Sequence, residues 1–339
     1  MFVSLEGLLA DPAPVLALAP MKAVTDLAFW RLFLRYGGAD LYTTEYVRVH
    51  VTSRLGPEIL QTVRENPTGR PVIVQLLGND PQALVRIAKE LAGLAVAAIE
   101  LNLGCPAPIV HRKFSGGGLL RDHNRVDKLV GTLRDAIVGK FSVKTRLGFT
   151  NPREFDDLLA IYAKHHLDLL VVHGRTVAEQ YQPGVHYDAI AQAVAAVSCP
   201  VLANGGIDTA PQAQQVLRQT GARGLMIGRA AIRNPWIFGQ IRKQLRGEIP
   251  TYPSGREVLA YVLALYEASG PPDAREELQV QKLKRCLSYL GVGIDPKREF
   301  LRQVLRVTTR QELEAVCLRF MDHERPMPLA PFSDAVSTD

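Results

Sequence analysis

The 339-residue sequence has few cysteines, and their positions exclude two classes of protein. Cys105, Cys199, Cys286 and Cys317 are far apart, and they form neither a CxxC pair nor a cluster with zinc-site spacing. We therefore predict no metal site and no disulfide framework. Scattered single thiols are typical of a reducing compartment.

The sequence also lacks segments that would direct it to a membrane. No stretch reaches the roughly 18 consecutive apolar residues of a membrane-spanning helix. The first lysine is Lys22, and Asp11 interrupts the apolar N-terminal stretch, which argues against a secretory signal. We expect a cytoplasmic protein without membrane association, and we expect a monomer.

Neither sign of charge dominates the composition. Lys and Arg number 40 against 34 for Asp and Glu, giving a net charge of +6. Such an excess permits a nucleic-acid or phosphate partner without requiring one. Hydrophobic residues make up 47% of the chain, enough for one large core or for a large domain and a small one.

Eight short apolar runs are present, and amphipathic segments lie between them. Apolar strands alternating with helices predict a parallel sheet covered on both faces, and eight such units in about 230 residues fit a (β/α)8 TIM barrel. The expected strands are 15–19, 40–44, 72–76, 98–102, 141–145, 169–173, 201–204 and 224–227. The alternative, an open doubly wound sheet, would place a GxGxxG turn after the first strand, where the sequence reads APMKAVTD.

The pattern changes after Leu245. The segment RGEIPTYPSGRE reads as a linker, and only helical periodicity follows it. We therefore expect an α/β protein with a TIM-barrel catalytic domain at 1–245 and a small C-terminal helical domain at 255–325. A loose C-terminal tail is expected at 326–339.

Polar residues follow most of the predicted strands, and barrel enzymes place their active groups at this end. Any one of them could be a buried group that only satisfies its own hydrogen bonds, but together they predict one binding rim. The candidates are Pro20, Met21, Gln75, Asn102, Lys144, Arg146, His173, Arg175, Asn204, Gly205, Gly206, Gly228 and Arg229.

The glycine turns after the last two strands predict a phosphate site, because backbone N–H groups can approach a phosphate closely there. Lys144 would then suit a flavin, since a cation near the N1 edge stabilises the anionic reduced ring. The alternative is a lysine that only lines the barrel mouth.

Cys105 lies just beyond a predicted strand, between Gly104 and Pro106. Glycine permits a tight turn and proline holds it, so we expect the thiol to point into the pocket. We find no clear histidine base beside it, and a neutral thiol can donate a proton. The alternative is a buried, inert cysteine. The basic run 111–113 could contact phosphates or simply be a solvated loop.

Seven motifs together resemble those of the tRNA-dihydrouridine synthases. They are AP-M (19–21), QLLG (75–78), LNLGCP (101–106), VKTRLG (143–148), VVHGRT (171–176), ANGGI (203–207) and MIGRA (226–230). The resemblance implies an FMN-bound barrel that is reduced by NADPH or NADH and acts on tRNA.

The resemblance also implies roles for individual residues. Hydride would pass from FMN N5 to uridine C6, and Cys105 would give the proton to C5. Asn102 and Arg146 would hold the uracil edge. The implied flavin contacts are Pro20, Met21, Lys22, Gln75, Lys144, His173, Asn204, Gly205, Gly206, Gly228 and Arg229.

Two further motifs, TEYVRV (44–49) and KLKRCLSYL (282–290), resemble the bacterial subfamily that modifies uridine 16 of the D-loop. Residues 276–310 hold eight Lys or Arg against four Asp or Glu, which suits phosphate contact. His111 and the longer loop HRKFSGGG depart from that subfamily. The residues expected to face tRNA are Arg48, Arg175, Lys282, Lys284, Tyr289 and Arg306.

Two other functions are compatible with parts of this pattern. An FMN barrel acting on a free small molecule, similar to dihydroorotate dehydrogenase, would need the flavin site but not a basic helical domain. A barrel that binds RNA without catalysis would not need Cys105, Lys144 and the phosphate turns together.

Overall fold

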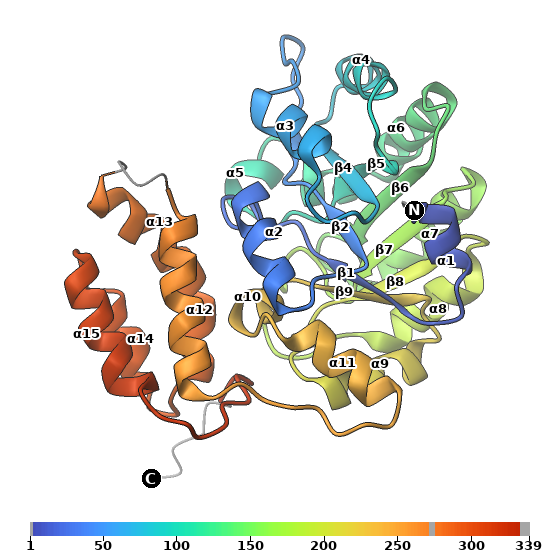
Figure 1. Cartoon of the computed structure of the whole chain (residues 1–339). Coiled ribbons are helices and arrows are strands. Elements are labelled where there is room, and N and C mark those ends of the chain that lie inside the picture. Colours follow the sequence, from blue (N-terminus) through green and yellow to red (C-terminus); the bar gives the residue numbers. More distant parts are fainter. Residues whose placement is uncertain (1–2, 271–274, 333–339) are drawn as a thin grey trace. The chain divides into compact units, whose positions relative to one another are not determined.

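The computed structural model describes residues 3–270 and 275–332, and its central feature is a closed barrel of eight parallel strands (Figure 1). β2 pairs with β4, and β9 pairs with β1, which closes the ring. The predicted barrel is confirmed and the open sheet is excluded. The strands are β1 (Val15–Leu18), β2 (Leu41–Thr43), β4 (Val72–Leu77), β5 (Ala98–Leu103), β6 (Phe141–Arg146), β7 (Leu169–His173), β8 (Val201–Asn204) and β9 (Gly224–Ile227).

A short strand outside the ring, β3 (Val47–Arg48), pairs with β4 and was not predicted.

The connections between the barrel strands carry helices whose starts follow local sequence signals. Asp80 caps α4 and Asp122 caps α6, each accepting a backbone N–H from the first turn. The elements are α1 (Leu5–Ala10), α3 (Pro57–Glu65), α4 (Pro81–Leu91), α5 (Pro108–His111), η2 (Gly116–Arg121), α6 (His123–Ala136), η3 (Pro152–Glu154), α7 (Phe155–Lys164), α8 (Tyr187–Ala196) and α9 (Ala210–Thr220).

The side chains inside the barrel change from apolar to polar along the strands. Every second residue of a strand faces the same side, so inward positions recur at i and i+2. One apolar cluster fills the end where the strands begin: Val15, Ala17, Leu41, Ile73, Ala98, Leu169, Val171, Leu202 and Met226. Two or four residues further on, the same strands carry Gln75, Glu100, Asn102, His173 and Asn204. The end where the strands begin is therefore an apolar core, and the end where they finish carries the polar groups.

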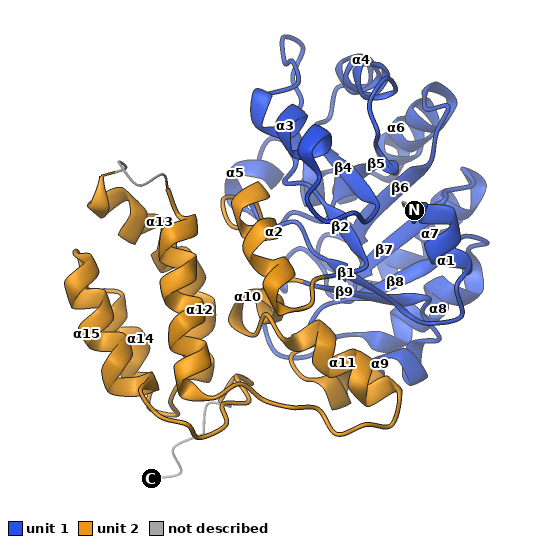
Figure 2. Ribbon diagram, viewed as in Figure 1, with its two compact units in different colours: residues 1–22, 39–207, 215–227 blue, residues 23–38, 208–214, 228–339 orange. Residues whose placement is uncertain are grey.

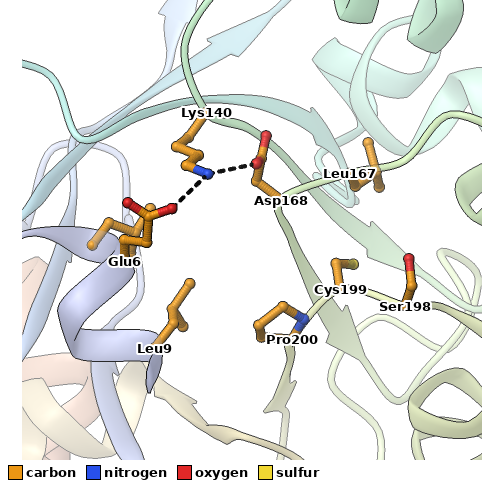
Figure 3. Close-up of a pocket in the computed structure, with 9 residues that line it drawn as sticks. Glu6, Leu9, Lys140, Leu167, Asp168, Ser198, Cys199 and Pro200 are labelled. Atoms are coloured by element: carbon orange, nitrogen blue, oxygen red, sulfur yellow. Dashed lines mark ion pairs between the residues drawn. The ribbon is translucent and has the colours of Figure 1, made fainter. Parts of the chain in front are cut away.

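Helix α1 covers the end where the strands begin. Leu5 belongs to the apolar cluster, and Arg223 donates to the carbonyl oxygens of Leu8 (3.0 Å) and Leu9 (2.7 Å). A cavity of about 270 Å³ lies there, beside Lys140, whose ammonium pairs with Glu6 at 3.3 Å and Asp168 at 3.2 Å (Figure 3). Barrel active sites lie at the opposite end, so we assign no catalytic role to this cavity.

The chain forms two compact units (Figure 2). The first comprises residues 1–22, 39–207 and 215–227, and it contains the barrel. The second comprises 23–38, 208–214 and 228–339, and within it α12 packs on α2, α13 and α15. Its elements are α2 (Leu27–Phe33), η1 (Leu34–Tyr36), α10 (Arg229–Arg233), α11 (Ile237–Leu245), α12 (Gly255–Ala268), α13 (Glu276–Leu290), η4 (Gly291–Gly293), α14 (Glu299–Val304) and α15 (Arg310–Met321).

Residues 326–332, expected as part of a loose tail, are held by the second unit. The Met327 N–H donates to Pro253 O at 2.7 Å, and the Leu329 carbonyl accepts from Arg233 Nε at 2.6 Å. The side chains of Met327 and Leu329 are buried. Alternating apolar residues in MPLAP are the sequence signal for this packing. The rest of the predicted tail, 333–339, lies outside the described residues.

Candidate active site

Polar side chains from β4, β5 and β6 form a hydrogen-bonded network inside the barrel. The strand register places Gln75 opposite Glu100 and Asn102 opposite Lys144. Gln75 Nε2 donates to Glu100 Oε1 at 2.7 Å, and Asn102 Nδ2 donates to Gln75 Oε1 at 2.7 Å. Ser142 Oγ donates to the other Glu100 oxygen at 3.0 Å. The predicted residues Gln75 and Asn102 therefore meet directly.

The network continues into the turn that carries Cys105. Asn102 Oδ1 accepts the backbone N–H groups of Gly104 and Cys105, both at 3.0 Å. The Cys105 carbonyl accepts the Gly117 N–H at 3.2 Å, which ties the turn to the glycine run. Burial raises the pKa of the Cys105 thiol above its ordinary value. The thiol is therefore protonated at neutral pH, the state of a proton donor rather than a nucleophile.

Lys144 brings an ammonium group to this end of the barrel. Its Nζ donates to Asn204 Oδ1 at 2.9 Å, and Asn204 Nδ2 donates to Met226 O at 2.7 Å. Burial lowers the pKa of Lys144 to about 8, and the negative charge of Glu100 opposes that shift. The ammonium is thus charged at neutral pH and loses its proton more readily than an exposed lysine.

Glu100 is a site residue that our sequence analysis missed. It is fully buried, and burial raises the pKa of its carboxyl group. An acidic residue within the apolar run VAAIELN, two positions before Asn102, was the available signal. Its interactions with Gln75, Ser142 and Lys144 make it the centre of the network.

Arg146 clamps two loops at the same end. Its Nε donates to Gly104 O at 2.9 Å, and its Nη1 donates to Thr176 O at 2.7 Å and Gln180 O at 2.8 Å. Only 2% of Arg146 is exposed, and its guanidinium lies 5.4 Å from the Tyr181 ring centroid. Arg146 therefore holds the Cys105 turn in place. Its predicted contact with uracil stays a prediction.

The turn after β8 needs glycine at both Gly205 and Gly206. Their φ angles are +111° and +66°, and a Cβ on Gly206 would stand 2.8 Å from Val185. Arg175 is 4% exposed, and its Nη2 lies 3.8 Å from that Cβ position. The tight turn and the nearby guanidinium suit an anionic group. In the second unit, Gly228 is the N-cap of α10, which begins at Arg229.

The remaining barrel candidates lie nearer to solvent, apart from His173, which is buried beside Asn204 in the strand register. Pro20 and Met21 are half-buried just beyond β1. Lys22 is 60% exposed and pairs with Glu45 at 2.9 Å. The charge of Arg48, on β3, lowers the pKa of the Cys105 thiol and partly opposes the effect of burial.

The candidates of the helical region belong to the second unit. Lys282 Nζ pairs with Asp26 Oδ2 at 2.9 Å, so its charge is already engaged on the protein surface. Lys284 and Tyr289 are half-buried on α13, and Arg306 is exposed after α14. Their predicted contact with tRNA stays a prediction.

Residues 3–270 and 275–332 lack two features that would point to other functions. These residues contain no group of three or more His, Cys, Asp or Glu that could hold a metal ion. None of their helices has the length and hydrophobicity that a membrane span requires.

The chain is similar to known proteins over most of its length. A family model described as "Dihydrouridine synthase (Dus)" matches residues 17–324. A probable tRNA-dihydrouridine synthase of Rhodobacter capsulatus is 36% identical over 79% of this chain and 83% of that protein. A tRNA-dihydrouridine(16) synthase of Cupriavidus necator is 34% identical over 80% and 88%. A tRNA-dihydrouridine synthase B of Pseudomonas aeruginosa is 33% identical over 89% and 90%.

A solved structure shares the fold at low identity. Histamine dehydrogenase from Rhizobium sp. 4-9 has a TM-score of 0.52 and 14% identity, over 75% of this chain and 50% of that chain. At this identity the likeness shows the fold and nothing more. The family match, the 33–36% identity to those three relatives and the arrangement around Cys105 agree, and the chain belongs to the dihydrouridine synthase family.

Proposed function

We propose that this chain reduces the C5=C6 bond of a D-loop uridine in tRNA, with bound FMN as cofactor and NADPH or NADH as reductant. The observation that carries the proposal is the protonated Cys105 thiol beside the hydrogen-bonded network of Glu100, Asn102 and Lys144. Family membership and the names of the relatives support tRNA as the substrate.

The residues at this end of the barrel fit a flavin phosphate and ring. The Gly205–Gly206 turn has positive φ angles and leaves no room for a Cβ on Gly206, as a turn that approaches a phosphate closely requires. Lys144 would hold the N1 edge of the ring, and Gly228 and Arg229 would supply phosphate contacts. When bound, reduced FMN supplies a hydride to C6 of the uracil.

The protein then has to supply a proton to C5 and to stabilise the charge that develops on the uracil. Cys105 holds a proton at neutral pH, and the Asn102 side chain fixes the backbone of its turn. The pKa of the Cys105 thiol must not rise too far, because a weaker acid donates its proton more slowly. The nearby cations Arg146, Lys144 and Arg48 limit that rise.

The target uridine has to leave its stack to reach the thiol, as in other enzymes that act on a base. The basic helical segment 276–310 would bind the tRNA backbone through Lys284 and Arg306, together with Lys282 once its pair with Asp26 opens.

We propose that the modified uridine is at position 16 of the tRNA, because the motifs at 44–49 and 282–290 resemble those of the subfamily that modifies this position. The chain is 34% identical to the synthase named for position 16 and 33% identical to a synthase B, and mapping of the modified nucleotide tests the assignment.

The test compares wild type with Cys105→Ala and Cys105→Ser. Purified protein, NADPH and unmodified tRNA transcripts are incubated, and dihydrouridine is mapped by reverse-transcription stops after alkaline cleavage. Wild type should be yellow and should modify one D-loop position. The alanine variant should retain flavin and tRNA binding but lose roughly 100-fold or more in turnover, the usual contribution of a general acid.

Serine is the matched control because it keeps the size and polarity of the side chain but is a far weaker acid. It should be nearly as slow as alanine. An alanine variant with wild-type turnover would eliminate Cys105 as the proton donor. A yellow wild type that oxidises NADPH yet leaves tRNA unmodified would instead indicate an oxidoreductase of free small molecules.

A further inference from the structure

Aromatic and basic side chains gather on the loop that follows Cys105. We call this surface the Arg121 patch and define it by His111, Arg112, Lys113, Phe114, Arg121, Arg125 and Phe149. All of it belongs to the barrel unit. Phe149 follows β6, and the other members lie on α5, on η2, between them and at the start of α6. The patch is therefore at the polar end of the barrel, where β5 and β6 end.

The side chains of the patch contact one another through guanidinium–ring and ring–ring interactions. The Arg121 guanidinium lies 3.6 Å from the Phe149 ring centroid and 5.7 Å from that of Phe114. The Arg125 guanidinium lies 5.8 Å from the Phe114 ring, and His111 meets Phe149 edge-on at 5.6 Å. Arg121 also donates to His111 O at 3.2 Å. These contacts hold the aromatic rings and the guanidinium groups together in one surface.

The charge of this surface is not neutralised by the protein. Arg112, Lys113, Arg121 and Arg125 are exposed, and none forms an ion pair with any residue that the structure describes. Phe114 is 44% exposed, although it is a large apolar side chain. Four unpaired cations around an exposed aromatic face suit a ligand that carries both negative charge and flat rings.

The patch adjoins the Cys105 turn directly. The Gly117 N–H donates to Cys105 O, and a Cβ on Gly116 would stand 3.1 Å from Cys105 Cβ. Phe114 precedes Gly116 by two residues, so its Cα lies within about 14 Å of Cys105 Cα. A polynucleotide that presents one base to the thiol would place its neighbouring nucleotides over this distance.

We propose that the Arg121 patch binds single-stranded RNA next to the reacting nucleotide, stacking a base on Phe114 and pairing phosphates with Arg112 and Lys113. The proposal rests on the proposed function, because it takes the RNA to be the tRNA that enters at Cys105. An acidic protein would use the cations but would have no need of the exposed Phe114 ring, so RNA is the better match.

The first test separates stacking from simple apolar contact. Phe114→Leu keeps apolar bulk without a flat face, and Phe114→Tyr keeps the face. Dissociation constants for an unmodified tRNA transcript should rise at least about fivefold for leucine and stay near wild type for tyrosine. Phe332→Leu, an exposed phenylalanine of the second unit, is the control and should leave the affinity unchanged. Equal affinities for all three variants would overturn the stacking role.

The second test concerns the cations. Arg112→Gln with Lys113→Gln should flatten the slope of log K against log salt by about 1.4, because single-stranded contacts contribute about 0.7 for each phosphate. The control is Arg64→Gln with Lys89→Gln, two exposed cations on α3 and α4. A control that flattens the slope equally would show that only net charge matters, which would refute a localised site.

The outcomes distinguish this inference from the proposed function. If wild type forms dihydrouridine while both sets of patch variants bind the transcript like their controls, the patch proposal is wrong and the function stands. The patch would then be available to an acidic protein instead. If affinity depends on the patch but wild type forms no dihydrouridine, the RNA surface is supported and the proposed function is wrong.

Discussion

Replacing Lys144 by methionine should change how the stability of the flavin-free protein depends on pH. Burial lowers the pKa of Lys144 from 10.5 to about 8 in the folded chain. Below pH 8 the lysine is charged in both the folded and the unfolded states, and the folded state bears the cost of the buried charge. Between pH 8 and 10.5 only the unfolded state keeps the proton, so folding becomes more favourable as pH rises.

The size of this effect follows from the shift. The difference between the two pKa values corresponds to a cost of about 3 kcal/mol at pH 7, which falls to about 1 kcal/mol at pH 10. Wild type should therefore gain about 2 kcal/mol relative to Lys144→Met over this range. The relevant assay is urea denaturation at several pH values, followed by far-UV circular dichroism. Both tryptophans, Trp30 and Trp236, lie in the second unit and would report on it instead.

Two further variants sharpen the test. Glu100→Gln removes the negative charge that raises the pKa of Lys144. In this variant the pKa of Lys144 should fall further, so the stability of the protein should begin to rise below pH 8. Lys89→Met, at an exposed lysine of α4, controls for the loss of any lysine. Parallel stability curves for wild type and Lys144→Met between pH 7 and 10 would refute the reasoning.

Two other predictions concern the framework of the fold. A Cβ on Gly224 would stand 2.1 Å from Val15 O, so Gly224→Ala should lower the free energy of unfolding by about 3 kcal/mol. Gly239 in α11 has open space around it, so Gly239→Ala should raise the free energy of unfolding by up to about 1 kcal/mol. Equal effects in denaturation would contradict this account. Asp208→Asn should destabilise by about 2 kcal/mol, because the buried Arg233 guanidinium loses its 2.5 Å partner while a third of the aspartate is exposed. Asp322→Asn, in the exposed pair with Arg256, should have a much smaller effect.

The barrel could be predicted because each of its strands is a continuous apolar run. Strands buried on both faces need such runs, and the helices between them begin at recognisable caps such as Asp80. The two-residue strand β3 could not be predicted in this way, because a pairing of Val47 and Arg48 with β4 has no periodicity to detect. Residues 326–332 were mistaken for tail because proline-rich composition concealed two buried positions, Met327 and Leu329.

Gln75 and Asn102 were predicted because each is a polar residue near the end of an apolar strand. The structure joins these two by a hydrogen bond. Glu100 was missed because it lies inside the apolar run of β5. It faces the barrel interior together with Asn102, because side chains two positions apart on a strand point to the same side. The sequence also could not show that Lys282 is paired with Asp26, since 256 positions separate them in the chain.

The pairing of β1 with β9 has a consequence for synthesis of the chain. Val15 lies beside Gly224, so one edge of the first strand has no partner until the ninth has left the ribosome. At 5–20 residues per second this interval is on the order of 10–40 s. During that time an apolar strand edge remains open to pairing with other chains. The unfinished barrel should therefore need protection by chaperones more than the stability of the complete barrel suggests.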